Sequence, residues 1–130
     1  MHDSEVVFAV LGQLRELGVR IALDDFGTGY SSLSFLQRFP FDKIKIDRSF
    51  VNELSSASAE AHHLARAVVR FAVSLGKTTT AEGVETKAQL DILREEGCIE
   101  TQGYYFSRPM PASSIAKMLR RGAGRAVRAA

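Results

Sequence analysis

The 130-residue chain has one cysteine, three prolines and no tryptophan. A single thiol, Cys98, excludes an intramolecular disulfide, so we expect a reducing, cytoplasmic setting and a small buried cysteine. No apolar run approaches the roughly 20 residues that a membrane-spanning helix requires. The N-terminus lacks the pattern of a signal peptide, so no membrane segment is expected. These absences leave a globular domain that has to be stabilised by its own core.

Acidic residues are missing from the last fourteen positions, which carry five basic residues. A basic tail of this kind can contact nucleic acid or anionic lipid, although frayed chain termini have the same composition. We therefore expect residues 122–130 to form a basic, disordered tail, assign it no function and expect no DNA binding. The whole chain has a formal net charge of only +2.

Hydrophobic periodicity predicts one helix followed by four strand–helix units. The expected helices are 2–17, 31–38, 59–75, 86–96 and 112–121, and the expected strands are 19–23, 41–47, 77–81 and 99–104. The first helix is expected to bury Val6, Val7, Val10, Leu14 and Leu17, and helix 59–75 to bury Leu64, Val68, Phe71, Ala72 and Leu75. Residues 48–58 are interpreted as a loop.

Successive strands joined by helices pair in parallel through right-handed crossovers, which makes this an α/β fold. Four such units form half of a TIM-type (β/α)8 barrel, and an open four-stranded sheet is the alternative. The strand 77–81 carries three consecutive threonines, an unusually polar composition for a barrel strand.

Polar residues follow each expected strand. The first strand ends at Asp24 and Asp25, which precede a glycine-containing loop formed by Phe26, Gly27, Thr28 and Gly29. The other strands end in Lys45 and Asp47, in Glu82 and Glu85, and in Gln102. Because functional groups of parallel α/β proteins collect at the carboxyl ends of strands, we expect these side chains to share one site.

Carboxylates without histidine or cysteine partners suit Mg²⁺, Mn²⁺ or Ca²⁺ better than zinc. Carboxylates that hold a pair of such ions are a common arrangement for cleaving phosphodiesters. Purely structural interpretations of the same residues also remain open at this point. One aspartate caps the next helix while the other is solvated, Lys45 forms a plain ion pair, and the glycine loop is only a tight turn.

Four motifs resemble, in family order, the C-terminal half of the EAL domain, a family that hydrolyses the bacterial second messenger cyclic di-GMP. The motifs are DDFGTGYSSLSFL at 24–36, KIDRSFV at 45–51, AEGVET at 81–86 and QGYYFSRPM at 102–110. This resemblance implies a partial EAL domain in residues 1–121, upstream sensory or GGDEF domains in the parent, and Mg²⁺ or Mn²⁺ as the cofactor.

The resemblance also implies residue roles. Asp24 corresponds to a ligand bridging two metal ions, and Asp25 and Glu82 to ligands of the second metal. Lys45 corresponds to the lysine that contacts the attacking water and shares the role of base with Asp24. It further implies a mobile loop at 26–32 and the substrate-binding residues Asp47, Glu85 and Gln102.

The Glu-Ala-Leu signature and two further ligands of the first metal site, an Asn and a Glu, are absent from this sequence. We therefore expect a fragment of a cyclic di-GMP phosphodiesterase, a hydrolase that forms linear pGpG, and expect this chain to be inactive alone. The open sheet edges of a half barrel predict self-association. The alternative is an inactive cyclic di-GMP receptor or protein-interaction module.

Overall fold

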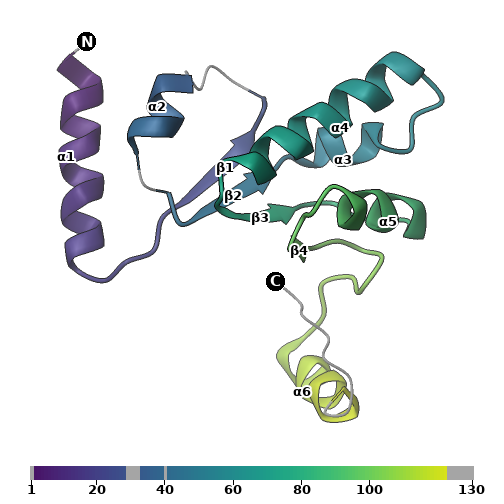
Figure 1. Cartoon of the computed structure of the whole chain (residues 1–130). Coiled ribbons are helices and arrows are strands. Elements are labelled where there is room, and N and C mark those ends of the chain that lie inside the picture. The colour runs from purple at the N-terminus through teal and green to yellow at the C-terminus, as the bar shows by residue number, and fades with distance from the viewer. Residues whose placement is uncertain (1, 29–32, 40, 123–130) are drawn as a thin grey trace.

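A computed structural model describes residues 2–28, 33–39 and 41–122 (Figure 1). The helices are α1 (His2–Glu16), α2 (Leu33–Arg38), α3 (Arg48–Glu53), α4 (Ala59–Ser74), α5 (Lys87–Glu95) and α6 (Ala112–Arg121). The strands are β1 (Ala22–Phe26), β2 (Lys43–Ile46), β3 (Thr78–Ala81) and β4 (Glu100–Thr101). The expected alternation of strands and helices is confirmed, while residues 29–32 of the predicted loop and tail residues 123–130 lie outside the described residues.

The four strands form one parallel sheet in the order β1-β2-β3-β4. Lys43 of β2 pairs with Ala22 of β1 and with Thr78 of β3. Consecutive parallel neighbours joined by helices are the arrangement of a (β/α)8 barrel, of which this sheet represents half. Within the described chain, the outer edges of β1 and β4 have no strand partner.

The two faces of the sheet have different side chains. Ile44 and Ile46 of β2 are fully buried, and α4 packs against β2 and β3 on this face. The alternate positions Lys43 and Lys45 are only half buried and point to the opposite face, which corresponds to the interior of a barrel. The helix-covered face therefore holds the apolar core, and the other face holds ionic groups.

The threonines of β3 fit this division. Thr80 lies opposite Lys45 and its hydroxyl donates a 2.7 Å hydrogen bond to Glu100 of β4. Thr79 points the other way and is buried beside Cys98, whose thiol lies 3.6 Å from the Thr79 carbonyl oxygen. The expected burial of Cys98 is confirmed, and this burial raises the pKa of its thiol.

Helix α4 buries a different stripe from the one predicted. Ala65, Val69 and Ala72 are its buried residues, whereas Leu64 is 61% exposed and Phe71 is 39% exposed. Only Ala72 of the predicted stripe is fully buried. Small side chains at this contact let the helix lie close to the sheet, so the larger hydrophobic residues next to them are displaced to the margins.

Helix α1 also differs from the expectation. Its predicted core positions are exposed, and it contacts the domain through the neighbouring Phe8 instead. The Phe8 ring lies 5.1 Å from the Phe35 ring and 5.9 Å from the Phe39 ring, centroid to centroid. The valine stripe stays exposed because no other described element covers that side of α1, which stands apart in Figure 1.

Several elements differ from the prediction. Strand β1 begins and ends three residues later than expected, so Asp24 and Asp25 lie within it, because Ala22, not Val19, starts the ladder with β2, and Val19 remains exposed. The predicted loop contains helix α3, which Asp47 caps by accepting a hydrogen bond from the Ser49 N–H. Strand β4 has only two residues, because after Thr101 the backbone turns towards Val84. In the described chain no helix is long and apolar enough to cross a membrane.

An ion cluster around the buried Glu96 side chain joins α4 to the end of α5 and gives a testable pH dependence. The Glu96 side chain is 5% exposed and accepts hydrogen bonds from Arg66 and from Arg70, the latter at 2.8 Å. These guanidiniums, Arg70 first, hold the pKa of Glu96 below its ordinary value. Because the pKa of Glu96 is lower in the folded chain than in the unfolded chain, the cluster stabilises the fold at pH values above the unfolded-state pKa. This stabilisation is lost as the pH falls through the folded-state pKa.

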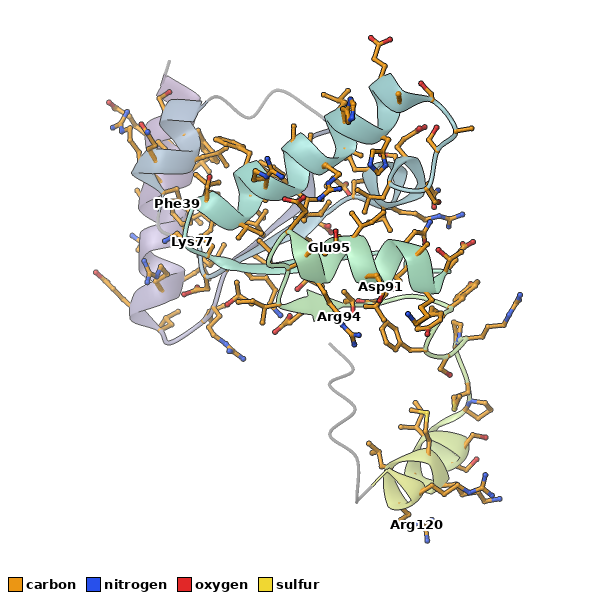
Figure 2. The ribbon with its side chains drawn as sticks, turned by 45° about the vertical axis from the view of Figure 1, so that its right-hand side comes forward. Phe39, Lys77, Asp91, Arg94, Glu95 and Arg120 are labelled. Atoms are coloured by element: carbon orange, nitrogen blue, oxygen red, sulfur yellow. The ribbon has the colours of Figure 1, made fainter. Side chains whose placement is uncertain are left out.

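We expect Glu96→Gln to lower the unfolding free energy by about 1–2 kcal/mol at pH 7 and by much less at pH 3. Thermal unfolding followed by circular dichroism at both pH values measures the difference. Glu95→Gln is the control. Glu95 is the last residue of α5 (Figure 2) and precedes Glu96 in the sequence, but its side chain is mainly exposed. An equal loss at both pH values would contradict the ionic explanation.

Candidate metal centre

The site begins with an irregular end of β1. The pairing of β1 with β2 shifts register between Leu23 and Phe26, which is the signature of a β-bulge. Asp25 has a φ of 52°, a left-handed conformation that is uncommon for a residue with a side chain. The Asp25 N–H donates a 2.8 Å hydrogen bond to the Asp24 carboxylate. The bulge therefore lies at Asp24 and Asp25, and at these two residues the side chains do not alternate regularly between the two faces of the sheet.

The following loop is fixed to the same point. The Thr28 hydroxyl donates a 2.8 Å hydrogen bond to the Asp25 carbonyl oxygen. Gly27 has a φ of 96°, and a Cβ there would lie 2.5 Å from the Phe50 ring of α3. Phe26 is buried and stacks on Phe71 at 6.0 Å. In its described part, residues 26–28, the predicted loop is thus a turn packed against α3 and α4.

Three carboxylates from two strands converge. Oxygen atoms of Asp24, Asp25 and Glu82 all lie within 4.8 Å of one another. Lys45 of β2 lies between the two strand ends, with its Nζ 2.5 Å from Glu82 Oε1 and 3.5 Å from Asp24 Oδ2. The structure thus brings together four of the residues that the sequence singled out, from three neighbouring strands.

The electrostatics of the group reflect crowding of like charges. The negative charge of Asp24 is the main cause that raises the pKa of Asp25, and Asp47 and Glu82 add to it. The hydrogen bond to Glu82 raises the pKa of Lys45, so its ammonium form is favoured. One ammonium does not neutralise three carboxylates, and the group attracts a further cation.

The donor set fits a hard divalent ion. Carboxylate oxygens are the ligands of Mg²⁺ and Mn²⁺, and no cysteine or histidine belongs to this group of the described residues. Asp24 and Asp25 are exposed and Glu82 is half buried, so oxygen atoms remain accessible to an incoming ion. Asp24, Asp25 and Glu82 are therefore the side chains that would hold a metal here.

Of the predicted substrate-binding residues, only Asp47 lies beside the acidic group, where it helps to raise the pKa of Asp25. Asp47 caps α3, and both the N–H and the hydroxyl of Ser49 donate to its carboxylate, which lowers its pKa. Its role as a cap was missed, although aspartate is among the residues preferred at helix N-caps. Glu85 is exposed, and its backbone N–H donates to Gln89.

Gln102 is separated from the acidic group. It is exposed and lines a cavity of about 370 Å³ between the end of β4 and α6, together with Tyr104, Met110 and Met118. The sequence analysis did not anticipate this mostly apolar cavity. The feature of the sequence that could have predicted the cavity is the cluster of aromatic and methionine residues between 104 and 118.

A parallel sheet with crossover helices and an acidic centre at the carboxyl ends of its strands defines a domain of the β/α-barrel class. The EAL domain model matches residues 1–109, and the chain belongs to the EAL domain family. The resemblance drawn from the four motifs is confirmed. The half-barrel fold is confirmed as well. The solved relatives are EAL domains, and this chain matches about half of the length of each of them.

Individual relatives have known activities. Over 120 residues the chain is 46% identical to the cyclic di-GMP phosphodiesterase NbdA of Pseudomonas aeruginosa, covering 92% of this chain and 15% of NbdA. The PaMucR phosphodiesterase, solved in a c-di-GMP complex, is 43% identical with a TM-score of 0.78, over 88% of this chain and 46% of that one. BlrP1 of Klebsiella pneumoniae, solved as a manganese/cy-diGMP complex, is 44% identical with a TM-score of 0.65, over 78% of this chain and 26% of that one.

The chain is much shorter than these proteins. It spans 13% to 19% of the length of these and similar curated relatives, and about half or less of the solved chains.

Proposed function

We propose that the chain is the metal-binding portion of a cyclic di-GMP phosphodiesterase that opens the cyclic dinucleotide to linear pGpG. The observation that carries the proposal is the convergence of Asp24, Asp25 and Glu82 around Lys45. The identity to NbdA supports the substrate, since NbdA is a cyclic di-GMP phosphodiesterase. The small share of NbdA that is matched supports a longer parent, with sensory or GGDEF domains as the proposed upstream parts.

Each residue of the group has a distinct task. Asp24, Asp25 and Glu82 hold Mg²⁺ or Mn²⁺, which would lower the pKa of a water and offset phosphate charge. The Lys45 ammonium would orient that water, and Asp24 would accept its proton. The ion pair with Glu82 keeps the Lys45 ammonium in place at the mouth of the sheet. Glu85 and Gln102 contact the dinucleotide on the outer side, and Asp47 positions Asp25.

This chain alone is expected to be inactive. Three carboxylates do not supply enough ligands for two ions, and one side of the group, along the free edge of β1, is open to solvent. The family's Glu-Ala-Leu signature, Asn and Glu, which the sequence lacks, would provide the remaining ligands.

The test compares the purified chain with a completed domain, in which the N-terminal half of the PaMucR EAL domain is fused ahead of residue 1. Each is incubated with cyclic di-GMP and Mn²⁺ or Mg²⁺, and linear pGpG is measured by chromatography. We expect product from the fusion and none from the chain. A folded fusion that binds cyclic di-GMP without cleaving it would favour a receptor. Product from the chain alone would overturn the incomplete-site argument.

Metal binding is testable on the chain itself. At Mn²⁺ about tenfold above its dissociation constant, we expect Tm to rise by about 4 °C, because the ion binds only the assembled carboxylates. Asp24→Asn should abolish this rise, whereas Asp91→Asn, an exposed acid of α5, should leave it unchanged. Equal shifts in both variants would exclude the acidic group as the binding site.

A further inference from the structure

Helix α5 places one polar side chain in the apolar core. Gln89 is 4% exposed and is one of the buried residues of this helix, together with Leu90 and Leu93. Burying a carboxamide costs free energy unless its oxygen and its nitrogen both find hydrogen-bond partners. None of the roles proposed above uses this residue, so its contacts have to explain why the core tolerates it.

Both ends of the Gln89 carboxamide have partners. Its Oε1 accepts hydrogen bonds from the backbone N–H groups of Glu85 at 2.8 Å and Thr86 at 3.1 Å. Its Nε2 donates to Ser55 Oγ at 3.2 Å. Two backbone donors require an oxygen opposite them, which fixes the orientation of the carboxamide. The Gln89 side chain therefore links the turn before α5 to the connection between α3 and α4.

The turn that Gln89 holds, residues 82–86, carries two of the proposed site residues. Glu82 is fixed independently of α5, because its N–H donates to the carbonyl oxygen of Ile46 in β2 at 3.1 Å. Glu85, at the other end of the turn, donates its N–H to Gln89. The sheet therefore anchors Glu82, and α5 anchors Glu85.

The second contact of the carboxamide holds the Gln89 side chain in place. Ser55 lies two residues beyond the end of α3, and its hydroxyl donates to the Asn52 carbonyl oxygen at 3.3 Å. Helix α3 follows its cap Asp47, which lies beside the acidic group. Through Gln89, the Glu85 turn is thus connected to the helix that starts next to the candidate metal centre.

We propose that Gln89 is a positioning residue for cyclic di-GMP, which acts by holding the backbone of Glu85. This inference rests on the proposed function, in which Glu85 contacts the dinucleotide. Gln89 itself contributes no atom to the substrate, because its carboxamide is buried and hydrogen-bonded within the chain. It keeps Glu85 at a constant place relative to the acidic group, so the turn does not have to be ordered when the substrate binds.

The neighbouring Thr86 provides a matched control. Thr86 and Gln89 form a capping box, in which Thr86 Oγ1 accepts from the Gln89 N–H at 3.2 Å and Gln89 Oε1 accepts from the Thr86 N–H. Loss of either side chain is therefore expected to destabilise α5. Thr86→Ala removes only its own half of the box and leaves the Glu85 N–H with its acceptor. Comparison of the two positions separates the positioning of Glu85 from the stability of the helix.

Steady-state kinetics of the completed domain test the proposal. Gln89→Met keeps an unbranched side chain but loses the carboxamide, so we expect KM for cyclic di-GMP to rise about tenfold while kcat changes by less than about twofold. Gln89→Glu keeps an acceptor for both N–H groups and should hold KM within about threefold of the original. Thr86→Ala should lower Tm about as much as Gln89→Met does, with KM unchanged. If the domain binds cyclic di-GMP without cleaving it, the dissociation constant replaces KM.

Amide hydrogen exchange of the chain itself, followed by nuclear magnetic resonance, gives a readout without activity. The Glu85 amide proton should exchange at least about tenfold faster in Gln89→Met, because its acceptor is lost. The Val84 amide, which donates to the Gln102 carbonyl oxygen, should keep its exchange rate. In Thr86→Ala the Glu85 amide should stay as protected as in the original chain.

The failure of this inference is distinguishable from that of the proposed function. A completed domain of the original sequence that neither binds nor cleaves cyclic di-GMP would overturn both. An active domain in which Gln89→Met leaves KM unchanged, or in which Thr86→Ala raises KM equally, would overturn only the role of Gln89. Loss of Mn²⁺ binding in Gln89→Met would also overturn it, since Glu82 is anchored by Ile46.

Discussion

Lys45→Met in the completed domain is expected to lower kcat for cyclic di-GMP hydrolysis by about 10²–10⁴. The substitution keeps an unbranched side chain, one heavy atom shorter, but removes the ammonium that lies 2.5 Å from Glu82 and 3.5 Å from Asp24. The ammonium that orients the attacking water towards Asp24 would be lost. Formation of pGpG, measured at saturating cyclic di-GMP, gives the effect.

Lys45→Met should not weaken metal binding, in contrast to its effect on kcat. The Lys45 ammonium competes with a cation for Asp24 and Glu82, so Lys45→Met should bind Mn²⁺ at least as tightly as the original chain. Asp24→Asn should lose both metal binding and hydrolysis, because it removes a ligand. A Lys45→Met variant that lost Mn²⁺ binding would assign Lys45 a purely structural role. Lys87→Met, at an exposed lysine of α5, is the control.

The second large effect is expected at Gly103, directly after Gln102. A Cβ at this position would lie 2.2 Å from the carbonyl oxygen and 2.3 Å from the nitrogen of the buried Val84. The Val84 backbone cannot shift freely, because its N–H donates to the Gln102 carbonyl and its carbonyl oxygen accepts from the Tyr105 N–H. We expect Gly103→Ala to cost about 3 kcal/mol of unfolding free energy, through overpacking and lost hydrogen bonds.

Thermal unfolding measures this cost, and an expected fall in Tm of about 10 °C or more makes it easy to detect. Gly12→Ala is the matched control, since a Cβ on this residue of α1 meets nothing within 4 Å. It should raise stability by about 0.5–1 kcal/mol, as alanine does in a helix interior. A Gly103→Ala variant as stable as the original would show that the turn after β4 is not held against Val84 as tightly as described.

The sequence determined the class of fold and most of the acidic centre. Alternating Ile and Lys residues at 43–46 specify a strand with one buried and one polar face, because the side-chain period of a strand is fixed at two. Asp24, Asp25, Lys45 and Glu82 could be predicted as neighbours because the carboxyl ends of parallel strands share one edge of the sheet.

Only the tertiary structure decided which hydrophobic residues are buried and which polar residues meet. Leu64 and Ala65 both fit an amphipathic helix, and the close approach of α4 to the sheet selects the smaller one. The valines of α1 form an ideal core stripe in the sequence, yet burial depends on a partner surface that the described chain does not provide. Gln102 follows a strand end like the other predicted residues, but the backbone turn towards Val84 places it in the apolar cavity near α6. The hydrophobic periodicity of a segment is a local property and specifies which face of a helix or strand is apolar. Which of these faces come into contact depends on how closely the helices and strands pack in the folded chain.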